Sequence, residues 1–298
     1  MTKRRVDGVL LLNKPAGVTS NAALQQVKRL YQAAKAGHTG TLDPFASGLL
    51  PICLGEATKF SQSLLDADKV YRATVRLGVR TTTGDPEGRV LETRPVAVAE
   101  ADVRRILPRF TGEFLQTPPM HSALKLAGRP LYAYAREGLE VERRPRPVVV
   151  RRLELLDFRG DAFTLLVESG KGLYVRTLAE DLGEALGCGA HLCALVRLAV
   201  GPLRLDQAVG LDALEALDMP ARDGRLLPVD ALLSALPRLD LDTDSAWQLG
   251  HGQAIWRAGL KVGDRLRAYG PDGRLIGLVE VDGEGRLAPK RLVTLKPA

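Results

Sequence analysis

The 298-residue sequence has few of the features that mark secreted, membrane-embedded or disulfide-stabilised proteins. Its three cysteines, Cys53, Cys188 and Cys193, cannot complete a disulfide framework, and their odd number fits a reducing compartment. The first apolar run, residues 8–12, is too short for the core of a signal peptide. No stretch approaches the ~20 apolar residues that span a bilayer. These absences predict a cytoplasmic protein with no membrane partner.

Cofactor-binding motifs are also missing. The sequence contains neither a G-x-x-x-x-G-K-[ST] loop for nucleotide triphosphates nor a G-x-S-x-G elbow of an α/β-hydrolase. Residues 169–175 open like a dinucleotide fingerprint, but Val175 occupies the position of the third glycine. Cys188, His191 and Cys193 lack the second ligand pair of a structural zinc site, so we interpret them as part of a core helix and loop. The sequence therefore predicts no cofactor, neither a nucleotide nor a metal.

What the sequence does contain is positive charge. The formal net charge is +7 and the pI is about 9.4, which favours a polyanionic partner. Most of the excess lies in residues 121–152, where eight cationic side chains face three glutamates and Tyr132 and Tyr134 lie among them. This combination suits phosphates and exposed bases, and the alternative is a solvated basic loop. The RNA-binding candidates are Lys125, Arg129, Arg143, Arg144 and Arg146.

The hydrophobic pattern mixes strands and helices without a regular βαβ cadence, which predicts an α+β (mixed α/β) catalytic body. Residues 121–152 interrupt this body as a basic insertion that can move. The expected strands are 9–12, 71–77, 148–158 and 163–169, and the expected helices are one capped by Ser20 or Asn21 and one over 175–186.

The C-terminal part has a different texture. Residues 206–230 are acidic and leucine-rich, as in a helical linker. Beyond residue 237, strands at 264–269, 275–281 and 287–295 are separated by turns, which predicts a small β-rich barrel or sandwich. We therefore expect two domains, 1–236 and 237–298.

One stretch, residues 35–50, sets a single carboxylate, Asp43, among glycines, a histidine and hydroxyl side chains. Pro44 biases Asp43 away from the α region, and glycines let the backbone turn and a ligand approach it. This favours a carboxylate placed for chemistry. The plainer alternative is a capped turn that leads into a helix near residues 47–50.

A second irregularity is Arg176, at the start of the helix expected over 175–186. Cations are disfavoured at a helix N-terminus, and such departures tend to mark functional sites. A nearby anion, either an RNA phosphate or Asp43, would resolve the conflict. The alternative is an exposed arginine that points back to solvent.

Several motifs follow one another along the chain from about Gly8 to the C-terminus. They are Asn13-Lys14-Pro15-x-Gly17, Gly37 to Leu50, Leu54-Gly55-Glu56-Ala57-Thr58-Lys59, Tyr71, Gly170 to Arg176, and Arg197-Leu198-Ala199-Val200. Together they resemble the bacterial TruB family of tRNA pseudouridine synthases, which modify uridine 55 of the TΨC loop. One departure is Val196, which stands where a second basic residue is expected beside Arg197.

The resemblance implies a pseudouridine synthase catalytic domain followed by a PUA-like RNA-binding domain, in a monomer that acts on the TΨC arm of tRNA. It implies that Asp43 is the catalytic carboxylate, that Tyr71 stacks on the target base and that Arg176 pairs with Asp43. His38 would fill the space of the flipped nucleotide. The other implied substrate-binding or supporting residues are Tyr174, Lys14, Leu195 and Arg197.

The residue chemistry agrees with this resemblance. Pseudouridine formation breaks the C1′–N bond, turns the uracil and rejoins it through C5, so it needs a flipped base, an ionised carboxylate and an aromatic face. Tyr71 and Tyr174 can supply the face, and a cation beside Asp43 would keep it ionised. The sequence leaves open whether the reaction proceeds by attack on the base, attack at C1′ or a glycal. The alternative functions are the same fold acting on another RNA, or an RNA-binding, tRNA-folding chaperone.

Overall fold

The computed structural model describes residues 3–294 and contains one large mixed sheet and one small one. The strands of the large sheet are β1 (Gly8–Lys14), β2 (Ala36–His38), β3 (Ser47–Leu54), β4 (Lys69–Leu77), β7 (Gly112–Gln116), β10 (Arg146–Phe158), β11 (Ala162–Ser169), β12 (Ala190–Val200), β13 (Leu203–Arg204), β14 (Val209–Gly210) and β15 (Leu226–Leu227). Its order is β14-β1-β3-β12-β4-β11-β10-β7, with β13, β15 and β2 paired to β12, β1 and β3.

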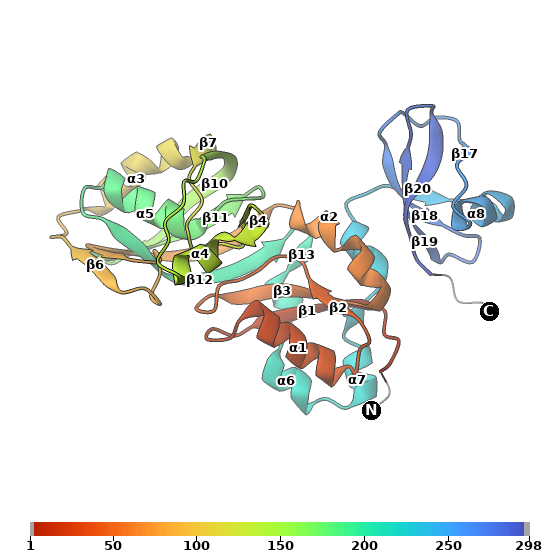
Figure 1. Ribbon diagram of the computed structural model, residues 1–298, viewed down its shortest axis with the longest axis horizontal. Helices are drawn as coiled ribbons and strands as arrows, with labels where there is room; N and C mark the ends of the chain where they lie inside the picture. Colours follow the sequence, from red (N-terminus) through yellow and green to blue (C-terminus); the bar gives the residue numbers. More distant parts are fainter. Residues whose placement is uncertain (1–2, 295–298) are drawn as a thin grey trace.

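The helices that pack on this sheet lie in two groups (Figure 1). The α-helices are α1 (Ser20–Leu30), α2 (Ser61–Leu65), α3 (Glu100–Ile106), α4 (Leu131–Arg136), α5 (Val175–Ala185), α6 (Leu211–Ala216), α7 (Met219–Asp223) and α8 (Thr243–Gly250). Short 3₁₀ helices are η1 (Gly55–Phe60), η2 (Leu107–Phe110), η3 (Leu205–Gln207) and η4 (Val229–Leu233). Helices α1 and α6 pack beside β1 and β3, whereas α5 packs on β12 and β4 and α3 on β10.

The sheet has a seam between these two groups. Strands β3 and β12 run parallel and are in register over only two pairs, Ser47 with Val196 and Gly48 with Arg197. Each of these strands has a longer, antiparallel pairing on its other edge, β12 with β4 and β3 with β1. Loops that leave the sheet at this seam can therefore enclose a cavity between the two halves.

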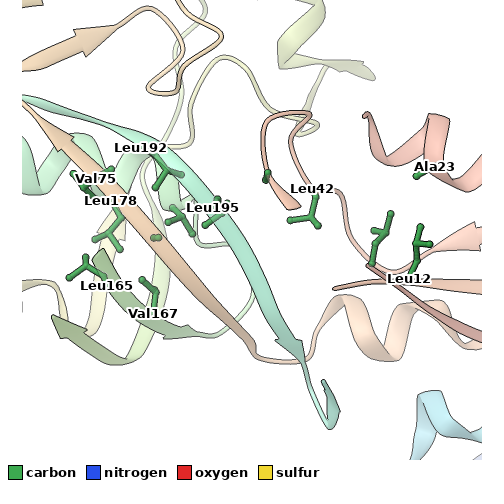
Figure 2. Close-up of a cluster of buried hydrophobic side chains, with 14 of the residues drawn as sticks. Leu12, Ala23, Leu42, Val75, Leu165, Val167, Leu178, Leu192 and Leu195 are labelled. Carbon is green, nitrogen blue, oxygen red and sulfur yellow. The ribbon is translucent and has the colours of Figure 1, made fainter. Parts of the chain in front are cut away.

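A hydrophobic core continues across the seam. Figure 2 shows Leu12 and Ala23 on one side and Val75, Leu178 and Leu192 on the other, all of them buried. Leu42, which precedes Asp43 in the chain, is also in this cluster and is only 3% exposed. Its burial anchors the Asp43 loop to the core.

Most of the expected elements form, and the start of the first helix differs by a residue. The strands β1, β4, β10 and β11 and the helices α1 and α5 confirm the pattern. The N-cap of α1 is Thr19, whose hydroxyl accepts a hydrogen bond from the Ala22 amide at 3.0 Å. Ser20 is instead in the first turn, and its hydroxyl bonds both the amide and the carbonyl of Leu42 at 2.8 Å.

Two local predictions are wrong. Residues 47–50 form the start of strand β3 and not a helix, because this continuous apolar run is buried on both faces and Pro51 would break a helix. The segment from Cys188 to Cys193 is a turn and strand β12 and not a helix and loop. Strand β12 lies between β3 and β4, and most of its alternate residues are buried. The six residues from Cys188 to Cys193 are too few to show this alternation in the sequence.

Two further small sheets flank the large one. The pair β5 (Val79–Thr81) and β6 (Val90–Thr93) forms a hairpin, and the pair β8 (Lys125–Leu126) and β9 (Arg129–Pro130) lies within the basic insertion, next to α4. The acidic linker contains α6, α7 and η4, all of which are short. Among residues 3–294, no helix is long and apolar enough to cross a membrane.

The C-terminal unit is a five-stranded sheet that stands at one end of the molecule (Figure 1). Its strands are β16 (Arg238–Asp240), β17 (Ile255–Trp256), β18 (Arg265–Tyr269), β19 (Leu275–Val281) and β20 (Arg286–Leu292), in the order β16-β18-β19-β20-β17. This is the β-rich unit that the turn pattern predicted, and α8 packs against β17, β19 and β20.

The small sheet is docked on the large body by apolar and polar contacts. Leu278 of β19 belongs to the same buried cluster as Val9 of β1. Lys59 of η1 donates to the carbonyl of Leu292 at 3.0 Å and to the hydroxyl of Thr294 at 3.1 Å. Lys59 also forms an ion pair with Glu56, whose carboxylate accepts from the Thr294 amide. The Leu54–Lys59 motif therefore holds the last strand of the chain in place.

Candidate active site

A cavity of about 810 Å³ lies beside the seam of the large sheet. Its walls come from the start of α1, the Asp43 loop, β4, the basic insertion and the start of α5. Of the residues predicted for the site, five line it together with Asp43, namely His38, Tyr71, Tyr174, Arg176 and Leu195. The structure thus collects residues that are up to 157 positions apart in the chain.

Asp43 and Arg176 form the ion pair that the sequence predicted. Nε of Arg176 lies 3.0 Å from Oδ2 of Asp43, and its second amino nitrogen lies 3.3 Å from Oδ1. The Arg176 side chain is 6% exposed and that of Asp43 is 32% exposed, so the arginine is not a solvated surface group. A two-point contact between a planar guanidinium and a carboxylate fixes orientation as well as charge.

Arg176 also binds a second carboxylate. Its NH1 group lies 3.3 Å from Oδ2 of Asp85, whose side chain is 4% exposed, and donates to the carbonyl of Thr83 at 3.1 Å. The carboxylate of Asp85 is fixed in turn by the Thr83 hydroxyl and by the Glu87 amide at 3.0 Å. One buried arginine is therefore shared by two aspartates, and the loop that carries Asp85 braces it.

The same guanidinium reaches the basic insertion. Its NH2 group donates to the carbonyl of His121 at 2.7 Å. Arg176 is the second residue of α5, and the buried face of this helix packs on β12. The arginine side chain therefore extends from a rigid backbone. The position of the insertion is thereby tied to the group that orients Asp43.

The electrostatic balance at Asp43 has opposing parts. Burial raises the pKa of its carboxyl above the ordinary value, and the neighbouring Asp85 raises it as well. Arg176 and Lys14 act in the opposite direction and favour the ionised form. Without Arg176, two carboxylates would share a poorly solvated space, and one of them would be neutralised by a proton.

Two tyrosines lie at the cavity. Tyr71 is on β4 and Tyr174 is the N-cap residue of α5. The backbone of Tyr174 is held by the side chain of Gln116, which accepts from the Tyr174 amide at 2.9 Å and donates to its carbonyl at 3.2 Å. Gln116 is 2% exposed and ends strand β7, directly before the insertion. Its amide therefore replaces a missing strand partner and positions Tyr174.

His38 and Leu195 complete the predicted lining. Burial lowers the pKa of His38, and Arg197 lowers it further, so His38 is neutral near pH 7. Its Nδ1 atom is buried without a hydrogen-bond partner among the residues that the structure describes. Leu195 is 7% exposed and belongs to the core cluster of Figure 2 as well as to the cavity wall. It gives the cavity an apolar floor.

Lys14 and Arg197 do not line the cavity but lie beneath the Asp43 loop, 0% and 1% exposed. Lys14 donates to the carbonyls of Val18 at 2.6 Å, Pro15 at 2.8 Å and Pro44 at 3.3 Å. Arg197 donates to Leu49 at 2.7 Å, Gly40 at 3.1 Å and Thr41 at 3.3 Å. Backbone oxygens thus satisfy both cations, which hold the loop on either side of Asp43.

Gly48 explains why the loop must contain a glycine where it rejoins the sheet. Its φ is +104°, and a Cβ atom there would lie 2.4 Å from the backbone oxygen of Arg197. The glycine is needed for the close approach of β3 to β12. Room for a ligand is not its purpose, contrary to the general expectation for glycines in this stretch. Gly40, by contrast, does line the cavity.

The five predicted RNA-binding residues of the insertion fall into two groups. Arg129 forms an ion pair with Glu137 and stacks on Tyr134 at 4.5 Å, and Arg143 pairs with Glu140 and donates to the Pro118 carbonyl at 3.2 Å. Lys125, Arg144 and Arg146 are exposed and form no ion pair within residues 3–294. All but Arg129 line a second cavity of about 420 Å³ within the insertion.

Sequence reasoning missed two residues of the site, Asp85 and Gln116. A signal for Asp85 was present, because Gly84-Asp85-Pro86 repeats the Asp-Pro pair of Asp43 and Pro44 beside a glycine. Nothing in the local sequence identifies Gln116. Two residues that were considered and rejected as metal ligands contact the backbone: Nδ1 of His191 donates to the Val79 carbonyl at 2.9 Å, and the Cys193 thiol contacts the Thr74 carbonyl.

Three family models match the chain. Residues 28–175 match "TruB family pseudouridylate synthase (N terminal domain)", and residues 176–234 match "tRNA pseudouridylate synthase B C-terminal domain". Residues 237–293 match "Pseudouridine synthase II TruB, C-terminal". The last boundary lies where the five-stranded sheet begins, although the domain limits themselves stay a prediction.

Relatives and solved structures agree with these matches. Proteins called tRNA pseudouridine synthase B from Burkholderia mallei (strain NCTC 10247) and Methylobacillus flagellatus are 58% and 54% identical to the chain. Each alignment covers 98% of this chain, and 99% and 96% of the relative. A crystal structure of a Cbf5-Nop10-Gar1 complex contains a chain of 27% identity with a TM-score of 0.73, covering 97% of this chain and 84% of that chain. The chain belongs to the TruB family of pseudouridylate synthases.

Proposed function

We propose that this protein isomerises uridine 55 to pseudouridine in the TΨC loop of tRNA, with Asp43 as the catalytic carboxylate. The observation that carries the proposal is the two-point Arg176–Asp43 pair at the wall of a cavity of about 810 Å³. The name tRNA pseudouridine synthase B, which relatives of 54–58% identity bear, supports tRNA as the substrate.

The geometry suits a base that has been taken out of its stack. The cavity offers the aromatic faces of Tyr71 and Tyr174 and the apolar Leu195, which can hold a uracil while it turns. Neutral His38, which lines the same cavity, can occupy space that the flipped nucleotide leaves. Because these groups bind the base through its faces, they permit rotation without breaking fixed hydrogen bonds.

Asp43 performs the step that these residues prepare. Ionised, it acts as a nucleophile or stabilises a cationic sugar while the bond between C1′ and N1 breaks. The uracil then turns, C5 bonds to C1′, and the proton of C5 is lost while N1 gains one. Tyr71, which lines the cavity, can move a proton at C2′ of the sugar through its hydroxyl. Substrate and product contain the same atoms, so the reaction has no net redox change.

The insertion supplies the RNA contacts in this proposal. Lys125, Arg144 and Arg146 form no ion pair with a carboxylate of the described residues, so they are available to bind phosphates. Arg129 and Arg143 instead hold the insertion together. The contact of Arg176 with the His121 carbonyl supports this role, because it ties the insertion to the wall of the cavity.

Replacement of Asp43 tests the proposal. Asp43→Asn should abolish tritium release from tRNA that contains 5-³H-uridine, and tRNA binding should persist because the basic insertion is unchanged. Asp157→Asn, which alters an exposed aspartate paired with Arg159, is the matched control and should leave release unaffected. Normal tritium release by Asp43→Asn would contradict the catalytic assignment. Release from other RNAs but not from tRNA would show that the same fold acts on another substrate.

A further inference from the structure

Helix α5 carries two glutamates on the same side as Arg176. Glu180 and Glu184 follow Arg176 at steps of four residues, so the three side chains form one stripe about 12 Å long. The segment 79–94, which contains β5, the loop of Asp85 and β6, lies along this stripe and contacts all three residues. Strand β6 lies at the end of the molecule opposite the C-terminal unit (Figure 1). The stripe therefore joins the Asp43 site to a region outside the cavity.

A closed ring of ion pairs forms the far end of this contact. Glu184 pairs with Arg80 of β5 at 3.2 Å and with Arg94, directly after β6, at 3.0 Å. Glu92 of β6 pairs with the same two arginines, at 3.4 Å and 2.8 Å. A single half-exposed ion pair contributes little, but here each charge has two partners of opposite sign, and such a network holds its geometry better. The ring ties both strands of the hairpin to the last turn of α5.

The hairpin loop rests on α5 between this ring and Arg176. A Cβ atom at Gly84, whose φ is +70°, would lie 2.9 Å from the carboxyl carbon of Glu180, so the loop backbone touches that side chain. The Gly84 carbonyl also accepts from the Leu192 amide of β12 at 3.0 Å. The next residue is Asp85, which binds the guanidinium of Arg176. A shift of the hairpin along α5 would therefore move Asp85 relative to Arg176.

We propose that Glu184 is a positioning residue for the reaction. Its ion-pair ring fixes the hairpin against α5, and the hairpin loop in turn fixes Asp85 against Arg176. The orientation of the Asp43 carboxylate thus depends on a charge two helical turns away that does not line the cavity. The inference rests on the proposed function, because it concerns the reaction assigned to Asp43. If the ring served only the stability of the fold, its loss would leave the rate of the folded enzyme unchanged.

Replacement of Glu184 by glutamine tests the proposal, because it keeps the size of the side chain and removes its charge. In single-turnover tritium release at saturating enzyme, the rate should fall about threefold to tenfold, since two ion pairs are lost. The affinity for tRNA should be unchanged, because the basic insertion is intact. Glu100→Gln, which breaks an exposed ion pair with Arg104 on α3, is the matched control and should change neither quantity. A wild-type rate for Glu184→Gln would overturn the proposal.

Two further readouts separate positioning from stability. The acid limb of the rate profile should move to higher pH in Glu184→Gln, because a less constrained Arg176 opposes the raised pKa of Asp43 less effectively. In an Asp85→Asn background, Glu184→Gln should have little further effect, because the route through Asp85 is already broken. An unmoved acid limb would overturn the proposal, as would a full threefold to tenfold loss in the Asp85→Asn background.

Amide hydrogen exchange follows the loop without any turnover. Residues 82–89, which include the Glu87 amide that donates to the Asp85 carboxylate at 3.0 Å, should exchange faster in Glu184→Gln than in the wild type. The amides of the central strand β11 should exchange at the same rate in both proteins. Unchanged exchange of residues 82–89 would overturn the route through the loop. Failure of the proposed function would appear separately, as absence of tritium release by the wild type.

Discussion

Replacing Arg176 by lysine is the most informative perturbation of the site, because it keeps the charge and removes the shape. The guanidinium makes five contacts, two to Asp43 and one each to Asp85, the Thr83 carbonyl and the His121 carbonyl. A lysine ammonium has three donors on one nitrogen and cannot reach all of these acceptors. At least two acceptors would therefore lose their partner.

The magnitude follows from the strength of one such contact. A hydrogen bond to a charged group contributes about 1.5–3 kcal/mol. If one bond to Asp43 is lost, kcat for Arg176→Lys should fall about 10- to 150-fold, since each 1.36 kcal/mol is a factor of about ten. Arg176→Met removes the charge too and leaves two carboxylates in a buried space. It should reduce the rate further and lower the stability by about 3–5 kcal/mol.

The assay is single-turnover tritium release over a series of pH values. Because the pKa of Asp43 is already raised by burial, loss of Arg176 contacts should raise it more and move the acid limb of the rate profile to higher pH. Arg159→Lys, which changes an exposed arginine paired with Asp157, is the matched control. An Arg176→Lys enzyme with a normal rate and an unmoved acid limb would refute the role of the pair.

Two further predictions concern buried and exposed cations. Burial lowers the pKa of Lys14 to about 8 from 10.5, so between these values the unfolded chain binds more protons and the free energy of unfolding rises with pH. Lys14→Met should remove up to about 3 kcal/mol of that rise. The measurement is urea unfolding of both proteins at the two ends of this pH range. The same pH dependence in the variant and the wild type would refute the burial argument. Neutralising Arg144 and Arg146 should reduce the slope of log affinity for tRNA against log salt concentration by about two. Neutralising Arg143 and Arg129, which are held in ion pairs, should leave this slope unchanged. Equal slopes for the two double variants would refute the distinction between free and paired arginines.

The prediction of Arg176 beside Asp43 had two sources. A cation at a helix N-terminus is unfavourable wherever the helix lies, so this local conflict favoured a nearby anion but left open whether it is an RNA phosphate or Asp43. The family resemblance identified Asp43, and the ion pair in the structure confirms it. Strand β4 and helix α5 were predictable because their signals are also local. Apolar residues alternate along β4 and recur at helical spacing along α5.

The remainder depended on contacts between distant segments. Gln116 acts on Tyr174 across 58 positions, and no local pattern marks a buried glutamine as a substitute strand partner. Nor does the sequence reveal that Lys14 and Arg197 are satisfied by carbonyls and not by carboxylates. Strand β3 was mistaken for a possible helix because distant segments bury its two faces. Leu50 and Ile52 pack in the cluster that contains α1, and Leu49 and Cys53 pack in the cluster that contains η1 and η4.

The docking of the small sheet has a mechanical consequence. Domains joined by a bare linker move independently, but here Lys59 and Glu56 hold residues 292–294 while Leu278 is packed into the core of the large body. The C-terminal unit therefore has a fixed position and orientation relative to the large body. An RNA that contacts both the Asp43 cavity and the C-terminal unit must match the fixed distance between them, and inserting one base pair between its two contact points would displace the far end both along and around the helix.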